Sequence, residues 1–201
     1  MSPRSSHLVV GDDGLARCPW GLSTDDYRRY HDTEWGRPVH GDDEIFERLS
    51  LEAFQSGLSW ITILRKRPAF RAAFTRFSIP SVADFDDADR ERLLADAGIV
   101  RNRAKVDATI ANARAAQALV TEQGAGALDA LVWSFAPPAR RRPRAPADVP
   151  ATTPESTALA RELKRRGFAF VGPTTAYAAM QAMGLVDDHL QGCSAPEAGR
   201  G

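Results

Sequence analysis

The chain has 201 residues, 43% hydrophobic and 26% charged, and its 26 basic and 26 acidic side chains cancel. This composition is typical of a soluble globular protein and excludes a disordered chain. No apolar run approaches the roughly 20 residues that span a bilayer, and the N-terminus carries no targeting pattern, so we expect a cytoplasmic protein with no membrane partner. Because the net charge is zero, a nucleic-acid partner would have to be bound by a local basic patch.

Helical patterns dominate the chain. Residues 41–67 open with an acidic turn and then place hydrophobic residues at intervals of three and four, at Ile45, Phe46, Leu49, Ala53 and Phe54. Further helices are predicted over residues 86–98, 101–120, 152–167 and 172–184. Strand-like alternation is confined to residues 168–172, so the pattern predicts an all-α fold.

Helix signals are sharpest near the C-terminus. Thr153 suits the N-cap position, Pro154 the first helical position, and Gly167 the stop of one predicted helix. Before it, residues 136–155 are rich in proline, alanine and arginine, which predicts a linker. Its arginine run at 139–144 could bind phosphate or could simply be solvated, as could the shorter run at 65–67.

The only two cysteines each have a histidine nearby. Cys18 precedes His31 by thirteen residues, and His189 precedes Cys193 by four. Two sulfurs and two nitrogens are the donor set of a tetrahedral structural zinc site, which here would join the two ends of the chain. The spacing is not that of a short zinc finger, so the alternative is a pair of inert buried thiols with unrelated histidines.

Residues 93–105 predict a helix, a tight turn and a second helix. Gly98 could supply a positive φ in the turn. The second helix begins beside Arg101, Arg103 and Lys105, and free amides at a helix start together with basic side chains suit a phosphate. A plain helical corner with solvated basic residues is the alternative.

A polar stripe with unusual aromatic neighbours surrounds Glu52. Helical spacing would place Glu52, Gln55, Ser56 and Ser59 on one face, which on its own is typical of a solvated surface. Several rings nearby do not suit such a surface: Trp20, Tyr27, Tyr30, Trp35 and Trp60. If the rings converge on Glu52, they form a box for a flat cationic ring such as an alkylated nucleobase. A base-excising enzyme that uses the hairpin to grip DNA becomes the leading hypothesis.

Six blocks of the chain closely resemble, in order and spacing, the 3-methyladenine DNA glycosylase I family (Tag) of the helix-hairpin-helix glycosylase superfamily. These blocks are CPWG, YHDTEWG, FERLSLEAFQSGLSWITILRKR, DAGIVRNRAK, VWSF and RELKRRGFAFVGPTTAYAAMQAMGLVDDHLQGC. The resemblance implies a helix-hairpin-helix glycosylase fold with a zinc-bearing lobe that joins the N- and C-terminal segments. Cys18, His31, His189 and Cys193 fall on the family's ligands for one structural Zn²⁺ per chain.

The resemblance also implies roles at the pocket. Glu52 falls on the base-recognising carboxylate and Tyr30 on the tyrosine that contacts the base, so these two are the expected catalytic residues. Trp60 falls on the stacking tryptophan. Three further rings match aromatic positions near the pocket, namely Trp20, Tyr27 and Trp35.

Contacts with DNA follow from the same resemblance. Gly57 and Leu58 correspond to the loop that enters the DNA stack as the base leaves it. The hairpin supplies the other expected DNA-binding residues, which are Gly98, Arg101, Arg103 and Lys105.

The implied domain plan has a flexible N-terminal extension over residues 1–17, one glycosylase domain over 18–193 and a C-terminal tail over 194–201. Within the domain, the hairpin lobe would span about 40–120 and the zinc lobe would come from both ends. The protein is expected to act as a monomer on double-stranded alkylated DNA, associated with the bacterial nucleoid.

The implied activity is hydrolysis of the N-glycosidic bond of 3-methyladenine, which releases the free base and initiates base excision repair. We expect a monofunctional enzyme because Lys105, the only lysine near the hairpin in sequence, matches an ordinary basic position. Asp107 lies too early in the second helix to serve as a catalytic carboxylate. The alternative is a noncatalytic, zinc-stabilised reader of damaged or abasic DNA, which would not need Glu52, Tyr30 and Trp60 together.

Overall fold

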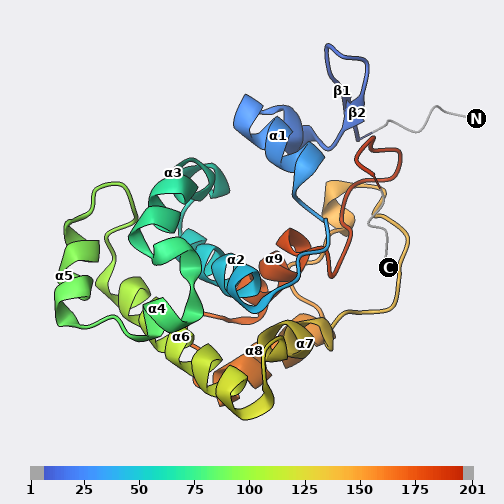
Figure 1. Cartoon of the computed structure of the whole chain (residues 1–201). Helices are drawn as coiled ribbons and strands as arrows, with labels where there is room; N and C mark the ends of the chain where they lie inside the picture. Colours follow the sequence, from blue (N-terminus) through green and yellow to red (C-terminus); the bar gives the residue numbers. More distant parts are fainter. Residues whose placement is uncertain (1–6, 197–201) are drawn as a thin grey trace, which may run out of the picture.

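The computed structural model describes residues 7–196, in which nine α-helices dominate (Figure 1). The helices are α1 (Asp25–Thr33), α2 (Asp42–Gln55), α3 (Trp60–Ala73), α4 (Ile79–Ala83), α5 (Asp87–Ala95), α6 (Arg103–Gln123), α7 (Ala127–Trp133), α8 (Pro154–Arg165) and α9 (Pro173–Ala182). The 3-10 helices are η1 (Pro19–Leu22), η2 (Thr75–Phe77) and η3 (Pro146–Asp148). None of the helices in this part of the chain is both long and apolar enough to cross a membrane.

Helix α2 lies at the centre of the fold and packs against α3, α6, α7 and α9 (Figure 1). The hydrophobic positions predicted for this segment are all in the core, with Ile45, Phe46 and Phe54 fully buried. The predicted helical periodicity is therefore confirmed over the first part of residues 41–67.

The prediction of one continuous helix over 41–67 is wrong. Helix α2 ends at Gln55, and α3 starts only at Trp60. Ser56 leaves helical geometry with φ −45° and ψ 118°, and Gly57 adopts φ +80°, which favours glycine. Ser56 and Ser59 therefore do not continue a polar stripe with Glu52, and because Glu52 is buried, the alternative of a solvated helical face is wrong.

The predicted hairpin is formed by α5 and α6, but Gly98 has a different role from the one expected. It does not adopt a positive φ. Its amide donates to Oδ1 of Asp96 at 2.7 Å, and a Cβ at this position would lie 3.0 Å from Cβ of Ala69 on α3. Close packing against α3, rather than turn geometry, explains the glycine.

The N-terminal and C-terminal segments of the described residues, which begin at residue 7 and end at residue 196, meet in one lobe (Figure 1). Strand β1 (Val9–Val10) pairs antiparallel with β2 (Ala16–Arg17), and the amide of Ser194 donates to the carbonyl of Ala16 at 2.7 Å. The flexible extension expected over residues 1–17 is thus a β-hairpin from Val9 onward; residues 1–6 lie outside the described part of the chain. Of the expected tail at 194–201, only residues 194–196 are described.

The C-terminal helix signals are confirmed. Oγ1 of Thr153 accepts the amide of Ser156 at 3.2 Å at the start of α8, and Gly167 ends that helix with φ +94°. Residues 168–172 form no strand; they are an irregular segment with a bend at Phe170 that leads into α9.

The arginine-rich part of the linker faces inward. Arg140 contacts buried Asp188 at 2.5 Å, and Arg142 binds Asp187 at 2.8 Å and the carbonyl of Cys193 at 3.2 Å. These contacts fasten the linker to the C-terminal segment. The two arginines are therefore engaged within the protein, although the Arg140 side chain stays 40% exposed; Arg141 and Arg144 are exposed as well.

Candidate metal centre and aromatic pocket

Cys18, His31, His189 and Cys193 come together although up to 175 positions separate them, and all four are buried. Sγ of Cys193 lies 3.5 Å from Nε2 of His31 and 3.8 Å from Nδ1 of His189. Sγ of Cys18 lies 3.9 Å from the same Nδ1. The cluster could bind a metal ion, and the alternative of unrelated residues is excluded.

The spacing of the donor atoms fits a tetrahedral ion. With zinc–sulfur and zinc–nitrogen bonds of about 2.3 and 2.0 Å, a sulfur and a nitrogen on one tetrahedral zinc lie about 3.5 Å apart. The four donor atoms here all lie within 4.8 Å of one another. Metal binding needs thiolates. The hydrogen bond between the two thiols lowers the pKa of Cys193 and raises the pKa of Cys18, so Cys193 is the one of the pair that ionises first.

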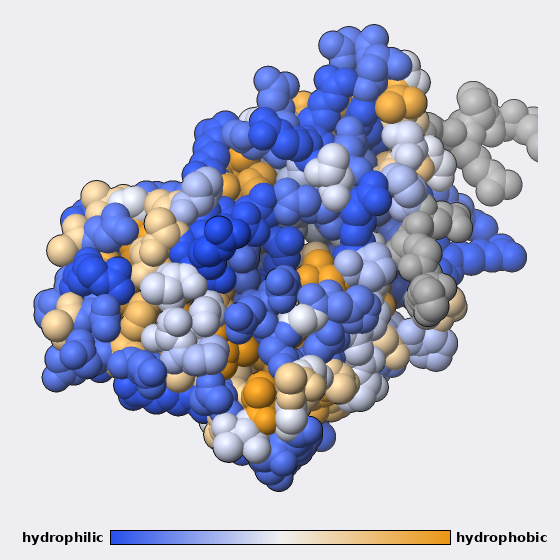
Figure 2. Space-filling view, in the orientation of Figure 1, coloured by the Kyte–Doolittle hydropathy of each residue, from blue (hydrophilic) through white to orange (hydrophobic). Residues whose placement is uncertain are grey.

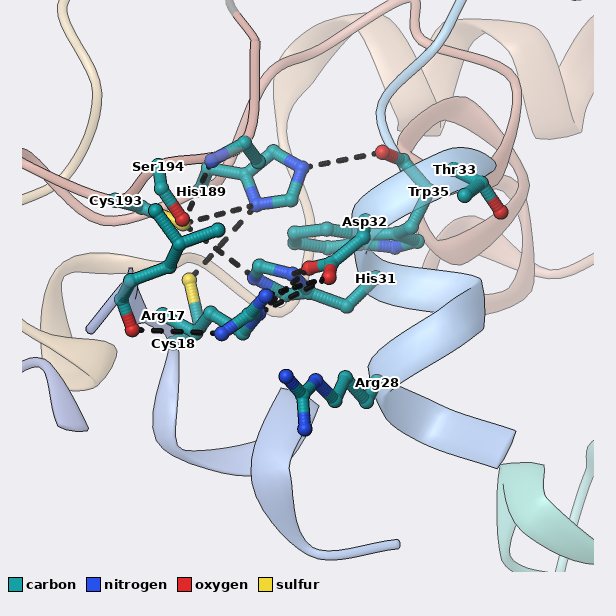
Figure 3. Close-up of polar contacts among 12 residues, drawn as sticks. Arg17, Cys18, Arg28, His31, Asp32, Thr33, Trp35, His189, Cys193 and Ser194 are labelled. Carbon is teal, nitrogen blue, oxygen red and sulfur yellow. Dashed lines mark hydrogen bonds and ion pairs between the residues drawn. The ribbon is translucent and has the colours of Figure 1, made fainter. Parts of the chain in front are cut away.

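Hydrogen bonds orient both imidazoles toward the sulfurs (Figure 3). Nε2 of His189 lies 3.1 Å from the carbonyl oxygen of Trp35, so Nε2 carries the proton and Nδ1 is free to bind metal. Nδ1 of His31 lies 2.8 Å from Oδ1 of Asp32, which leaves Nε2 of that ring facing Cys193.

Arg17 and Asp32 support the cluster, and the sequence interpretation missed both. Arg17 is only 2% exposed and donates through Nε to Asp32 at 2.9 Å and through Nη2 to Asp13 at 2.7 Å. Burial opposes ionisation of Asp32, but the hydrogen bonds from Arg17 and His31 prevail and lower its pKa. The sequence signal that could have indicated both residues is their position next to two predicted ligands, Arg17 before Cys18 and Asp32 after His31.

A cavity of about 240 Å³ lies beside the cluster. Its walls include every residue predicted for the aromatic box, namely Trp20, Tyr27, Tyr30, Trp35, Glu52 and Trp60. The volume is below the roughly 300–1,000 Å³ of sites for drug-sized ligands, so the cavity suits a small flat molecule.

Glu52 is buried in this cavity without a neutralising partner. Its side chain accepts no hydrogen bond from the described residues, and burial raises its pKa from 4.5 to about 8, with a partial opposing effect of Arg48. An unpaired buried carboxylate is costly for a fold and is typical of a functional site.

The aromatic walls come from η1, α1, the turn after α1 and α3. Tyr30 on α1 and Trp60 at the start of α3 face each other with ring centroids 5.5 Å apart and planes inclined by 44°. The Tyr27 hydroxyl accepts the amide of Ile61 at 3.0 Å, which fixes α1 against α3. Nε1 of Trp60 is buried without a partner, and burial near Glu52 raises the pKa of the Tyr30 hydroxyl.

The pocket and the metal cluster share a wall. Trp20 contacts His31 with centroids 5.1 Å apart, and Trp35 contacts His189 at 4.7 Å. The two tryptophans also pack edge to face at 5.0 Å. Whatever holds the two histidines in place therefore also positions two rings of the pocket.

Three pocket residues were not predicted: Gln55, Ala178 and Gln181. Gln55 had been assigned to the polar stripe. Gln181 on α9 donates from Nε2 to Oδ2 of Asp188 at 2.8 Å, and Asp188 also accepts the Tyr177 hydroxyl at 2.6 Å. Because residues 172–184 were predicted only as a helix, no sequence signal marked the side that reaches the pocket.

The predicted DNA contacts do not all face solvent. Leu58 is 42% exposed in the turn after α2, and Arg101 and Arg103 are exposed at the start of α6. Lys105 is buried and donates through Nζ to the carbonyls of Phe54 and Ser56 at 2.9 and 2.6 Å. Its predicted role as a phosphate ligand does not fit this geometry.

The surface around these elements is largely hydrophilic in the view of Figure 2, with small separate hydrophobic patches. The fold and the site together define a helical protein with a hairpin of two helices, a lobe whose buried cysteines and histidines could bind a metal ion, and an aromatic pocket that contains a buried carboxylate.

Comparison with known proteins gives the family. The methyladenine glycosylase family matches residues 20–196, and the chain belongs to it. DNA-3-methyladenine glycosylase 1 of Escherichia coli K12 is 45% identical over 181 residues, which cover 89% of this chain and 96% of that protein. DNA-3-methyladenine glycosylase of Haemophilus influenzae is 42% identical over 180 residues, 88% of this chain and 96% of the relative.

A solved structure resembles the fold closely. A tyrosine-to-phenylalanine variant of 3-methyladenine DNA glycosylase I in complex with 3-methyladenine superposes with a TM-score of 0.84 at 31% identity. The match covers 91% of this chain and 99% of that one. The helical fold predicted from the sequence is therefore confirmed.

Proposed function

We propose that this chain is a monofunctional DNA glycosylase that hydrolyses the N-glycosidic bond of 3-methyladenine in alkylated double-stranded DNA. The observation that carries the proposal is Glu52, an unpaired buried carboxylate inside an aromatic pocket of base size. The family and its relatives, named for this base, support the same substrate.

The charge of the damaged base explains why such a pocket is sufficient. Methylation at N3 makes adenine cationic, so its glycosidic bond is weak and the base leaves as a neutral molecule. Water supplies a hydroxyl to C1′, the bond's electron pair goes to the base, and one proton is released. Little activation of the leaving group is needed, and selection of the base becomes the main task of the site.

Glu52 favours the cation over normal adenine. A cationic purine offsets the cost of ionising the buried carboxylate, whereas neutral adenine leaves that charge unpaired. Tyr30 and Trp60 offer ring faces to the extruded base, which offsets part of the few kcal/mol that flipping costs. The other rings, Tyr27, Trp20 and Trp35, complete the box.

Strand cleavage is not part of the activity. A nicking enzyme needs an amine nucleophile at the reacting sugar. Burial lowers the pKa of Lys105, which favours a nucleophile, but both of its hydrogen bonds go to main-chain carbonyls and it does not line the pocket. Asp107 is bound by Arg90 at 2.5 Å, so it is not a free catalytic carboxylate.

The metal ion is Zn²⁺, one per chain, with a structural role. Two thiolates and two imidazoles are a tetrahedral zinc set with no open position for water. The ion would hold both ends of the chain together and keep Trp20 and Trp35 at the pocket.

DNA is held around the pocket mouth. Gly57 and Leu58 would enter the stack as the base leaves it, and Arg101 and Arg103 would bind phosphates at the start of α6. Gly98 contributes by letting the hairpin pack closely against α3. The protein acts as a monomer in this scheme.

The test is release of free base from methylated duplex DNA, resolved by chromatography into 3-methyladenine, 7-methylguanine and 3-methylguanine. The proposal predicts rapid release of 3-methyladenine while 7-methylguanine stays in the DNA. No release by folded protein with about one equivalent of zinc would contradict it and favour a noncatalytic reader of damaged DNA.

A further inference from the structure

Lys105 is a buried lysine to which the proposed function gives no task. It is only 7% exposed, and burial lowers its pKa. It also lies in the first turn of α6, where Oδ1 of Asn102 accepts its amide, and a cation is unfavourable at the N-terminus of a helix. A buried charge at such a position is costly for the fold, so the contacts of the side chain should explain why a lysine is there.

The contacts of Lys105 satisfy the C-terminus of α2. Its Nζ donates to the carbonyl of Phe54 at 2.9 Å and to the carbonyl of Ser56 at 2.6 Å. Neither carbonyl has a main-chain partner, because α2 ends at Gln55. A cation is favourable at this end of a helix. Lys105 therefore joins the end of α2 to the start of α6.

The segment that Lys105 holds is a type II β-turn over residues 55–58. Ser56 has φ −45° and ψ 118°, Gly57 has φ +80°, and the amide of Leu58 donates to the carbonyl of Gln55 at 2.6 Å. Residues 56–59 are exposed, so packing contributes little to the shape of the turn. Among the described residues outside α2, only Lys105 forms a hydrogen bond to residues 56–58.

This turn lies at the edge of the pocket. Gln55 is its first residue and Trp60 follows it by two positions, and both line the cavity. Leu58, between them, is 42% exposed. The chain is thus attached to the pocket wall on both sides of Leu58, and the conformation of the turn decides where this side chain points.

We propose that Lys105 is a positioning residue, which fixes the turn in the conformation that directs Leu58 into the DNA stack as the base leaves it. Without its Nζ, the two carbonyls would be left to water, and the turn would have to become ordered when DNA binds, which is costly. Lys105 also links the turn to the start of α6, where Arg101 and Arg103 would bind phosphates. This inference rests on the proposed function, because it takes base flipping from a duplex as the reaction.

The test compares release of 3-methyladenine from two methylated duplexes, in which the target adenine faces either thymine or cytosine. A mismatched base is easier to flip than a paired one, so its release depends less on Leu58. Lys105→Met keeps the length of the side chain and removes its donors. Its single-turnover release from the paired target should fall about 10- to 100-fold, the range for one hydrogen bond to a charged group, and release from the mismatched target should fall less.

Binding of free 3-methyladenine should not change in Lys105→Met, because Lys105 does not line the pocket. Lys164→Met is the matched control. It removes the same charge from an exposed position on α8 and should keep the parent's ratio of paired to mismatched release.

Two further variants distinguish positioning from a general structural role. In a Leu58→Ala background, Lys105→Met should cause little additional loss, because its effect depends on Leu58. Gly57→Ala strains the same turn at φ +80°, although the added Cβ would meet no atom within 4 Å. It should lose paired release more than mismatched release, and it tests the inference even where Lys105→Met does not fold.

The outcomes that contradict the inference are distinct from failure of the proposed function. If the parent releases 3-methyladenine, but the Lys105 and Gly57 variants lose release equally from both targets or lose none, the inference is wrong and the proposed function stands. Additive losses from Lys105→Met and Leu58→Ala would also overturn it. If the parent releases no base from either duplex, the proposed function fails and the inference fails with it.

Discussion

The metal cluster and the aromatic pocket both contact Trp20 and Trp35, but they differ in whether their buried polar groups have hydrogen-bond partners. In the cluster, both imidazoles have a hydrogen-bond partner on the nitrogen that faces away from the sulfurs. In the pocket, the carboxylate of Glu52 and Nε1 of Trp60 have no hydrogen-bond partner among the described residues.

This difference separates what stabilises the fold from what carries function. Buried polar groups are nearly always satisfied within a protein, so the exceptions indicate where a ligand is expected. The imidazoles of the cluster have hydrogen-bond partners within the protein, and the cluster adjoins two walls of the pocket. The pocket retains its unsatisfied groups, and a cationic base would satisfy Glu52.

Loss of the metal should have the largest effect. Structural zinc contributes on the order of 10 kcal/mol of apparent binding energy in small zinc domains, and here the ion would join both ends of the chain. We expect chelation, or Cys193→Ser, to lower the melting temperature by at least about 10 °C in a thermal scan.

Zinc added after chelation should restore the parent but not Cys193→Ser, which serves as the control. An unchanged melting temperature in chelator would contradict a structural role for the ion.

The next largest effect should come from replacing the buried Glu52, which changes the free energy of unfolding. Its pKa of about 8 in the folded protein, against 4.5 unfolded, means that the folded state binds more protons, so stability falls as pH rises from about 4.5 to 8. Glu52→Gln removes this penalty and should be more stable than the parent by about 4 to 5 kcal/mol above pH 8. Urea unfolding of both proteins between pH 6 and 9 measures the difference, and a pH-independent difference would show that Glu52 is not desolvated.

Substitution of Arg17 should have a smaller effect, which is confined to the metal affinity of the cluster. Arg17 holds Asp32, which is the hydrogen-bond partner of His31, and loss of such outer-shell contacts around a metal ligand typically costs 10- to 100-fold in metal affinity. Arg17→Gln should show this loss in competition with a zinc chelator, whereas Arg28→Gln, a partly exposed ion pair with Asp12 and Asp13, should not. Equal affinities for the two variants would mean that Arg17 only stabilises the N-terminal hairpin.

Local signals account for what could be predicted. Thr153, Pro154 and Gly167 mark the ends of α8 through their own backbone preferences, so no other part of the fold is needed to find them. The cysteine and histidine set was found because those residue types are few and have a specific chemistry.

The burial of polar side chains could not be predicted from local sequence signals. Periodicity placed Glu52 on a polar face, but α1 and α9, distant in sequence, cover that face in the fold. Lys105 was assigned to phosphate because its sequence neighbours are basic, while its real partners are main-chain carbonyls at the end of α2. Arg17 was assigned to a flexible extension because its two carboxylate partners become apparent only after folding.

The most direct test of the central claim is the affinity of the pocket for free 3-methyladenine and for adenine, followed through tryptophan fluorescence. Free 3-methyladenine and Glu52 can share one proton in the pocket, either as neutral base with carboxyl or as cation with carboxylate. We predict that the parent and the control Glu44→Gln, exposed on the same helix, prefer 3-methyladenine, and that Glu52→Gln loses this preference. If Glu52→Gln binds 3-methyladenine as tightly as the parent does, the role assigned to Glu52 is wrong.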